Sequence, residues 1–207
     1  MIWLPEEIVF PPHEFANEDG VLAFGGDLSA ERLIYAYKNG VFPWFSEGEP
    51  IVWYSPTERM VLFPDELRVS KSMRQVLRKN NFKITENKAF KEVIFNCRYI
   101  DRNDQLGTWI TDDMEDAYIN LHEKGITKSI EVWVEDVLVA GLYGVDLNNG
   151  VFCGESMFSK ASNMSKVAFI HLVKNCGYKL IDCQVYNEHL ESLGAREVDR
   201  SDFLKWL

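Results

Sequence analysis

The stretch Lys179-Leu180-Ile181-Asp182-Cys183-Gln184-Val185 puts an acid and an amide into what otherwise reads as a buried β-strand. Side chains alternate faces along a strand, so Asp182 and Gln184 are expected to point one way and Ile181 the other. A carboxylate taken out of water needs a partner, and the Gln184 side-chain amide can donate to Asp182. The pair is therefore either a structural brace or the floor of a functional site.

The composition around this strand is that of a globular chain. Apolar residues make up 46% of the 207 positions, which suffices for one large domain, or for a large domain with a small appendage. No apolar run approaches the ~18–20 residues of a membrane span, and residues 1–7 lack the basic start of a secretory signal. We therefore expect a cytoplasmic protein without a membrane partner.

The cysteines and histidines show no metal-binding spacing. Cys97, Cys153, Cys176 and Cys183 form no Cys-x-x-Cys pair, and the four histidines are equally scattered. In a chain without an export signal, such cysteines are read as reduced thiols. The sequence predicts no metal site.

The net charge of −10 is unevenly distributed. Residues 1–66 carry 3 basic and 12 acidic side chains, whereas residues 67–83 carry 6 basic side chains and no acid. Within that basic segment Lys71, Arg74 and Arg78 follow one helix face at i, i+3 and i+7. The stripe is either an ordinary solvated face or a site for phosphates, since the field near the contact matters more than the net charge.

Periodicity and capping signals predict a mixed α/β chain with a hairpin-rich sheet and helices packed on it. A composition change at 55–68 separates an acidic, aromatic segment from a basic one, and we place the domains at 1–62 and 63–207. The predicted helices cover 30–39, 70–80, 88–98, 111–124 and 165–175. The predicted strands cover 51–54, 60–63, 129–134, 137–145, 151–153 and 179–185.

Two further features have both a structural and a functional interpretation. Residues 154–159 follow a strand and precede a helix, so Glu155 beside Gly154 is either a turn residue or a carboxylate where a ligand can approach. Loop tryptophans such as Trp44 and Trp109 are either core residues or platforms on which a base stacks, for ~1–3 kcal/mol each. The chain lacks a Gly-x-Ser-x-Gly nucleophile, a Walker loop and a dinucleotide fingerprint.

Six motifs in order nevertheless identify a family. The chain resembles the bacterial leucyl/phenylalanyl-tRNA–protein transferases over nearly its whole length. The motifs are Gly25-Gly26-Asp27-Leu28-Ser29, Gly40-Val41-Phe42-Pro43-Trp44-Phe45-Ser46, Gly107-Thr108-Trp109-Ile110-Thr111, Gly154-Glu155-Ser156-Met157-Phe158-Ser159, Leu180-Ile181-Asp182-Cys183-Gln184-Val185 and Ser192-Leu193-Gly194-Ala195.

The resemblance implies a fold and an activity. The fold is a small N-terminal α/β domain joined to a C-terminal domain like that of the GNAT acetyltransferases. The activity moves leucine or phenylalanine, and less often methionine, from aminoacyl-tRNA to proteins that begin with Arg or Lys, which marks them for N-end-rule degradation. It implies no cofactor, a cytoplasmic location and a monomer.

The resemblance also implies roles for particular residues. Asp182, Gln184 and Glu155 would be catalytic, and Trp44 and Trp109 would hold the 3′-terminal adenosine of the tRNA. A pocket for the aminoacyl side chain would be lined by Leu142, Phe152, Met157, Phe169, Leu172 and Ile181. The tRNA backbone would lie on Lys71, Arg74, Arg78, Lys79 and Lys83.

An activated ester needs only a well-placed amine, so we hypothesise that the Gln184 carbonyl orients the amine while Asp182 polarises Gln184. Whether the pair relays a proton or only positions the amine stays open. One rival function is acyl-CoA-dependent N-acetylation, although the Gly-rich pyrophosphate loop it needs is missing before Ser165. Another rival is a non-catalytic module that binds RNA or a peptide.

Overall fold

The computed structural model describes residues 2–100 and 109–207, so Gly107 and Thr108 of the third motif lie outside the described residues. The helices are α1 (Ala30–Lys38), α2 (Lys71–Lys79), α3 (Phe90–Tyr99), α4 (Asp112–Glu123), α5 (Met164–Asn175), α6 (Glu188–Glu191) and α7 (Arg200–Phe203), with 3₁₀ turns η1 (His13–Phe15), η2 (Pro64–Glu66) and η3 (Leu204–Trp206). The strands are β1 (Trp3–Leu4), β2 (Val21–Gly25), β3 (Phe42–Pro43), β4 (Val52–Tyr54), β5 (Glu58–Leu62), β6 (Lys83–Glu86), β7 (Thr127–Val134), β8 (Val137–Asp146), β9 (Val151–Ser159), β10 (Leu180–Gln184) and β11 (Arg196–Asp199).

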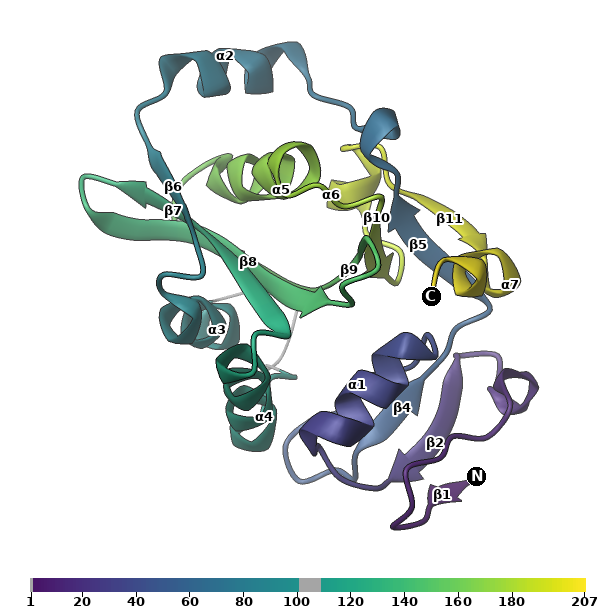
Figure 1. Cartoon of the computed structure of the whole chain (residues 1–207). Helices are drawn as coiled ribbons and strands as arrows, with labels where there is room; N and C mark the ends of the chain where they lie inside the picture. The colour runs from purple at the N-terminus through teal and green to yellow at the C-terminus, as the bar shows by residue number, and fades with distance from the viewer. Residues whose placement is uncertain (1, 101–108) are drawn as a thin grey trace.

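The N-terminal elements form a four-stranded sheet in the order β1-β2-β4-β3, with α1 beside it (Figure 1). Helix α1 begins where predicted, because the Ser29 hydroxyl accepts a hydrogen bond from the Arg32 backbone N–H at 3.3 Å. It ends before Gly40, whose φ of +70° suits glycine. A Cβ at Gly40 would come within 2.6 Å of Leu204, so the C-terminal segment packs directly on this turn.

The remaining strands form a seven-stranded sheet in the order β11-β5-β10-β9-β8-β7-β6. Its one parallel pair is β9 with β10, and the other neighbours are antiparallel. The predicted hairpin of β7 and β8 is confirmed, with Glu135 and Asp136 at φ +49° and +61° in the turn. Helix α5 covers one face of the sheet, and α3 and α4 cover the other (Figure 1).

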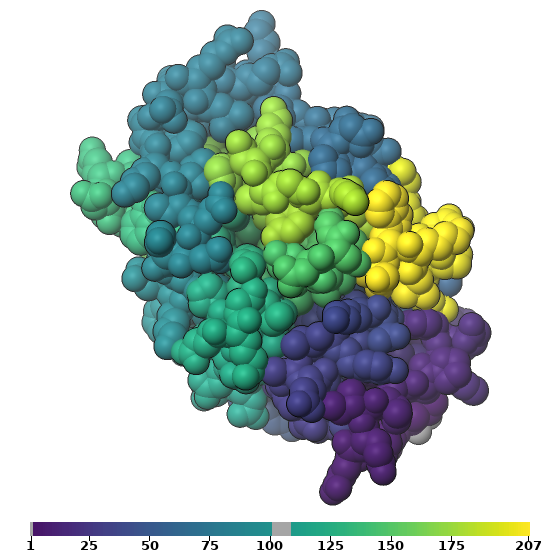
Figure 2. Space-filling model, viewed as in Figure 1, coloured from purple at the N-terminus to yellow at the C-terminus, as the bar shows by residue number. Residues whose placement is uncertain are grey.

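Alternation along β8 divides the interior into two cores. Leu142 faces the cluster that includes α5, and the next residue, Tyr143, faces the cluster that includes α3 and α4. This second cluster also takes in Tyr37 of α1 and Phe42 of β3, so the N-terminal elements share it with the larger sheet. In the space-filling view, the N-terminal segments lie against α4 and against the C-terminal segment (Figure 2). Within the described residues no helix is long and apolar enough to cross a membrane.

Strand β5 bears on the domain boundary that we predict at 62/63. It pairs with β10 and β11 in the seven-stranded sheet, although the predicted boundary assigns it to the N-terminal domain. The predicted boundary at 62/63 and the gap between β4 and β5 both lie within the composition change at 55–68. We propose that the boundary be drawn at 55–57, between β4 and β5.

Three local expectations were wrong. Residues 154–159 do not follow a strand: they continue β9, which therefore runs as far as Ser159. Strands β6 and β11 were missed, because each is only 4 residues long and lies at an edge of the sheet with mostly polar side chains. Residues 1–29, where no helix or strand was predicted, contain β1, η1 and β2.

Candidate active site

A pocket of about 570 Å³ opens between the N-terminal elements and the seven-stranded sheet. The structure brings to its walls both predicted tryptophans, the three predicted polar residues and the six predicted apolar residues. Five of the apolar residues are buried, and Met157 is partly exposed. The roles assigned to all eleven residues stay predictions.

Asp182 lies on the floor of this pocket, is fully buried and is paired with a cation that the sequence analysis missed. Arg59 on β5 donates from Nε to Oδ1 at 2.8 Å and from a terminal nitrogen to Oδ2 at 2.7 Å, which is a bidentate fork. The guanidinium lies 4.5 Å from the Phe42 ring centre and 4.8 Å from that of Phe203. Burial opposes the charge of Arg59, but the Asp182 carboxylate raises its pKa overall. Asp182 is therefore a braced, neutralised carboxylate.

A β-bulge after Asp182 breaks the predicted alternation. Gln184 has a φ of +64°, and the pairing of β10 with β5 shifts register between Asp182 and Gln184. The backbone N–H of Gln184 donates to Asp182 Oδ1 at 2.9 Å. The predicted bond between the Gln184 side-chain amide and Asp182 was wrong, because that amide donates to Glu155 Oε1 at 2.8 Å.

Glu155 on β9 is held by neutral donors. Tyr37 of α1 donates to its Oε1 at 2.7 Å, and Tyr118 of α4 donates to its Oε2 at 3.0 Å. The two tyrosine hydroxyls also contact each other. This carboxyl group therefore joins the N-terminal elements, α4 and β10 at one point.

The surroundings of Glu155 change its protonation. Desolvation raises its pKa from 4.5 to about 8, while the hydrogen bonds from the tyrosines and Gln184 oppose that shift and the nearby Asp182 charge adds to it. Burial, together with the Glu155 charge, raises the pKa of Tyr37 and of Tyr118 well above 10. At pH 7 the free site therefore holds Glu155 mainly protonated and both tyrosines neutral.

The residues that sequence reasoning missed are Arg59, Tyr37 and Tyr118. Arg59 had a signal, since it directly precedes the apolar run Met60–Leu62 in a segment with few cations. The tyrosines had none, because a tyrosine on the apolar face of a helix reads as a core residue. Both are indeed almost fully buried, and only the tertiary structure shows that their hydroxyls meet at a carboxylate.

The two tryptophans differ in their surroundings. Trp44 follows β3, is 38% exposed and has its ring 5.7 Å from that of Tyr54. Trp109 precedes α4 and is partly buried. Both line the pocket, so an aromatic surface is available beside the polar floor.

The basic segment lies elsewhere. Helix α2 crosses above α5 and buries Met73, while its cationic side chains are exposed (Figure 1). Lys83 follows on β6 and is also exposed. The pocket lining includes none of the five predicted tRNA-backbone residues Lys71, Arg74, Arg78, Lys79 and Lys83.

Comparison with solved structures gives the fold. The structure described as the crystal structure of FemX matches 70% of this chain and 60% of that chain with a TM-score of 0.52, at 9% identity. A GCN5-related N-acetyltransferase from Kribbella flavida matches 77% of this chain and 57% of that chain with a TM-score of 0.38, at 11% identity. The predicted mixed α/β fold is confirmed.

Sequence comparison gives the family. Residues 61–207 match the family described as leucyl/phenylalanyl-tRNA protein transferase, and residues 26–57 match the family described as its N-terminal domain. Leucyl/phenylalanyl-tRNA–protein transferases of Flavobacterium johnsoniae, Christiangramia forsetii and Pseudomonas fluorescens are 61%, 53% and 51% identical to the chain. Each alignment covers 100% of this chain and 99%, 100% and 93% of the respective relative. The chain belongs to the leucyl/phenylalanyl-tRNA–protein transferase family, and the enzyme class that we predicted is confirmed.

Proposed function

We propose that this protein transfers leucine or phenylalanine, and less readily methionine, from aminoacyl-tRNA to the N-terminal Arg or Lys of proteins. The observation that carries the proposal is the hydrogen bonding of the pocket floor. The side-chain amide nitrogen of Gln184 donates a hydrogen bond to Glu155. Its side-chain carbonyl accepts no hydrogen bond from the residues that the structure describes. That oxygen is free to accept a hydrogen bond from the attacking amine.

The substrates divide the pocket between them. The aminoacyl side chain occupies the apolar part, and the terminal adenosine stacks on Trp44 and Trp109. The tRNA backbone continues towards α2, whose exposed cations hold phosphates without reading sequence. This division explains why the basic side chains lie outside the pocket.

The chemistry is attack of a neutral amine on an ester that is already activated. The N–C bond forms as the ester C–O bond breaks, and the tRNA ribose oxygen leaves with a proton. Placing the two reactants can contribute ~7–11 kcal/mol to the barrier reduction. No ATP, metal or acyl-enzyme is needed for this step.

The two carboxylates have different parts in the step. Asp182 is a positioning residue. It accepts a hydrogen bond from the backbone N–H of Gln184, and its charge is balanced by Arg59. Glu155 is the proton acceptor in its deprotonated form, which is the minor form at pH 7 and grows as the pH rises through about 8; this pKa is close to the ~7.7–8.0 of an α-amino group. A proton can therefore pass from the incoming ammonium to Glu155 at little cost in free energy.

The acceptor preference follows from the same charge balance. Asp182 is already matched by Arg59, so only the deprotonated form of Glu155 offers a cationic N-terminal side chain an unpaired negative charge in this pocket. Modified proteins would then carry an N-end-rule degradation signal. We expect a monomer in the cytoplasm.

Single-turnover transfer of labelled leucine from charged tRNA to a peptide that begins with Arg tests this function. The matched control is the same peptide with an acetylated N-terminus, which has no amine to react. We expect transfer to the free peptide alone, and no acetyl transfer from acetyl-CoA to either peptide. Acetyl transfer would favour the N-acetyltransferase alternative, and binding without any transfer would favour a non-catalytic module.

A further inference from the structure

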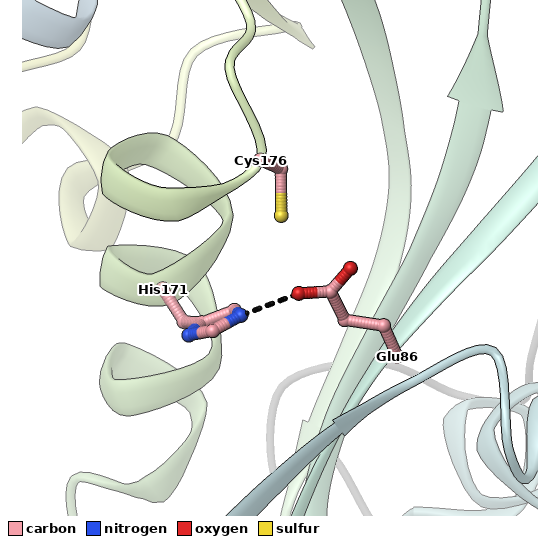
Figure 3. A group of neighbouring side chains, drawn as sticks. All are labelled: Glu86, His171 and Cys176. Atoms are coloured by element: carbon pink, nitrogen blue, oxygen red, sulfur yellow. Dashed lines mark hydrogen bonds and ion pairs between the residues drawn. The ribbon is translucent and has the colours of Figure 1, made fainter.

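Three side chains of the kinds that bind transition metals meet outside the pocket described above. They are Glu86, the last residue of β6, His171 on α5 and Cys176 at the end of α5 (Figure 3). His171 Nε2 and Glu86 Oε1 lie 2.8 Å apart, and the three potential ligand atoms all lie within 4.8 Å of one another. None of the three lines the 570 Å³ pocket.

The spacing of these atoms is close to that of a metal site. Zinc binds sulfur at ~2.3 Å and nitrogen or oxygen at ~2.0–2.2 Å, which sets tetrahedral ligand atoms roughly 3.4–3.6 Å apart. The Nε2–Oε1 pair must therefore open by roughly half an ångström, and the Cys176 sulfur must approach by up to roughly 1.2–1.4 Å. Side-chain torsions are the degrees of freedom for both changes.

The surroundings hold a second carboxylate. A hollow of about 290 Å³ is lined by Glu86, Cys176, Asp146 and Tyr178 among others. The Tyr178 hydroxyl donates to Asp146 Oδ2 at 3.2 Å, so this carboxylate is held within the lining of the hollow. Lys128 lines the same hollow and opposes a cation, so binding must rest on direct ligation rather than on the local net charge.

We propose that Glu86, His171 and Cys176 bind one Zn²⁺, with a water molecule as the fourth ligand. A thiolate with an imidazole favours zinc over magnesium or calcium, which prefer oxygen ligands. Binding requires the Cys176 thiol to lose its proton to solvent, and no redox change accompanies it. The ion ties β6, an edge strand of the sheet, to α5.

No spacing in the sequence indicates this site. His171 and Cys176 are five positions apart on and beyond one helix, and Glu86 is 85 positions from His171. Only the packing of β6 against α5 joins them. The proposal is independent of the transferase reaction and does not rest on it.

The test begins with the full-length protein, reduced and stripped of metals with a chelator. We expect one equivalent of Zn²⁺ to bind, and a melting temperature higher by roughly 5–10 °C at a hundredfold excess of zinc over Kd. Cobalt(II) should give the visible bands of a tetrahedral site together with a thiolate charge-transfer band. Zinc should also slow alkylation of Cys176, measured by peptide mass mapping.

Cys176→Ser, His171→Asn and Glu86→Gln should each weaken zinc binding by at least about 100-fold, because each removes a ligand. The matched control is Glu92→Gln, at an exposed carboxylate on α3, which should bind zinc like the unmodified protein. Equal affinity in all four variants would overturn the proposal. So would cobalt binding without a thiolate band, or a stripped protein that takes up no zinc.

Discussion

Glu155 and Asp182 lie on neighbouring strands of one sheet, yet the side chains that bond to them differ in charge. Asp182 is fully buried and faces a guanidinium that meets both of its oxygens. Glu155 borders the pocket and faces two hydroxyls and an amide, with no cation among its hydrogen-bonding partners in the described part of the chain. Desolvation is the largest cause of the raised pKa of Glu155, and its neutral donors oppose it only in part, whereas the charge of Asp182 is matched by a guanidinium.

The strongest test of the comparison removes the cation. Arg59→Met should destabilise the protein by about 3–5 kcal/mol, because it leaves the Asp182 charge buried and unpaired. Urea denaturation measures the change. The double variant Arg59→Met/Asp182→Asn removes both charges and should be clearly more stable than Arg59→Met alone. Equal stability of the single and double variants would mean that the ion pair does not brace the floor.

A second test removes the proton acceptor and leaves the brace in place. Glu155→Gln should slow single-turnover transfer by ~10²–10⁴-fold at saturating substrates. In the unmodified protein the rate should rise with pH through about 8 as Glu155 loses its proton. The substrate amine loses its proton over the same pH range with both proteins. The pH–rate profile of Glu155→Gln should therefore show one ionisation fewer than that of the unmodified protein, namely the ionisation of Glu155. An unchanged pH profile would remove Glu155 from the proton-transfer step.

A third test uses stability in place of activity. The folded protein keeps a proton on Glu155 up to a pH of about 8, whereas the unfolded chain releases it near the ordinary value of 4.5. The unfolded state therefore binds fewer protons in this window, and stability falls as pH rises from 4.5 to 8, by at most ~1.4 kcal/mol per pH unit. Melting temperatures of Glu155→Gln should show a shallower fall over the same range. A steeper fall in the variant would contradict the assignment.

The smallest effect is expected away from both carboxylates, on α2. Reversing three of its charges should raise the KM for aminoacyl-tRNA and lower the log–log salt slope of binding by roughly two to three. The single-turnover rate at saturation should stay the same, which is the opposite of the result at Glu155. The variant is Lys71→Glu/Arg74→Glu/Arg78→Glu, and the matched control is Lys38→Glu/Lys91→Glu/Lys124→Glu. Equal salt dependence in both variants would reject α2 as the tRNA-binding face.

The sequence by itself determined the fold class, the family and, to within two residues, the bounds of the five longest helices. Local signals suffice there: Ser29, Ser70 and Thr111 cap helices that begin at the next residue, and alternation identifies β7 and β8. Seven of the eleven residues that meet in one pocket lie in the ordered motifs, and the family resemblance implied the other four, Leu142, Phe152, Phe169 and Leu172.

Only the tertiary structure decided what the polar residues bond to. The bulge at Gln184 turns its amide from Asp182 to Glu155, and the partners Arg59, Tyr37 and Tyr118 come from 123, 118 and 37 positions away in the chain. A pKa depends on desolvation and on neighbours in space, neither of which residue type or spacing records. Strand β10 therefore holds both a brace, Asp182, and part of a site, Gln184. Only the folded chain separates these two roles.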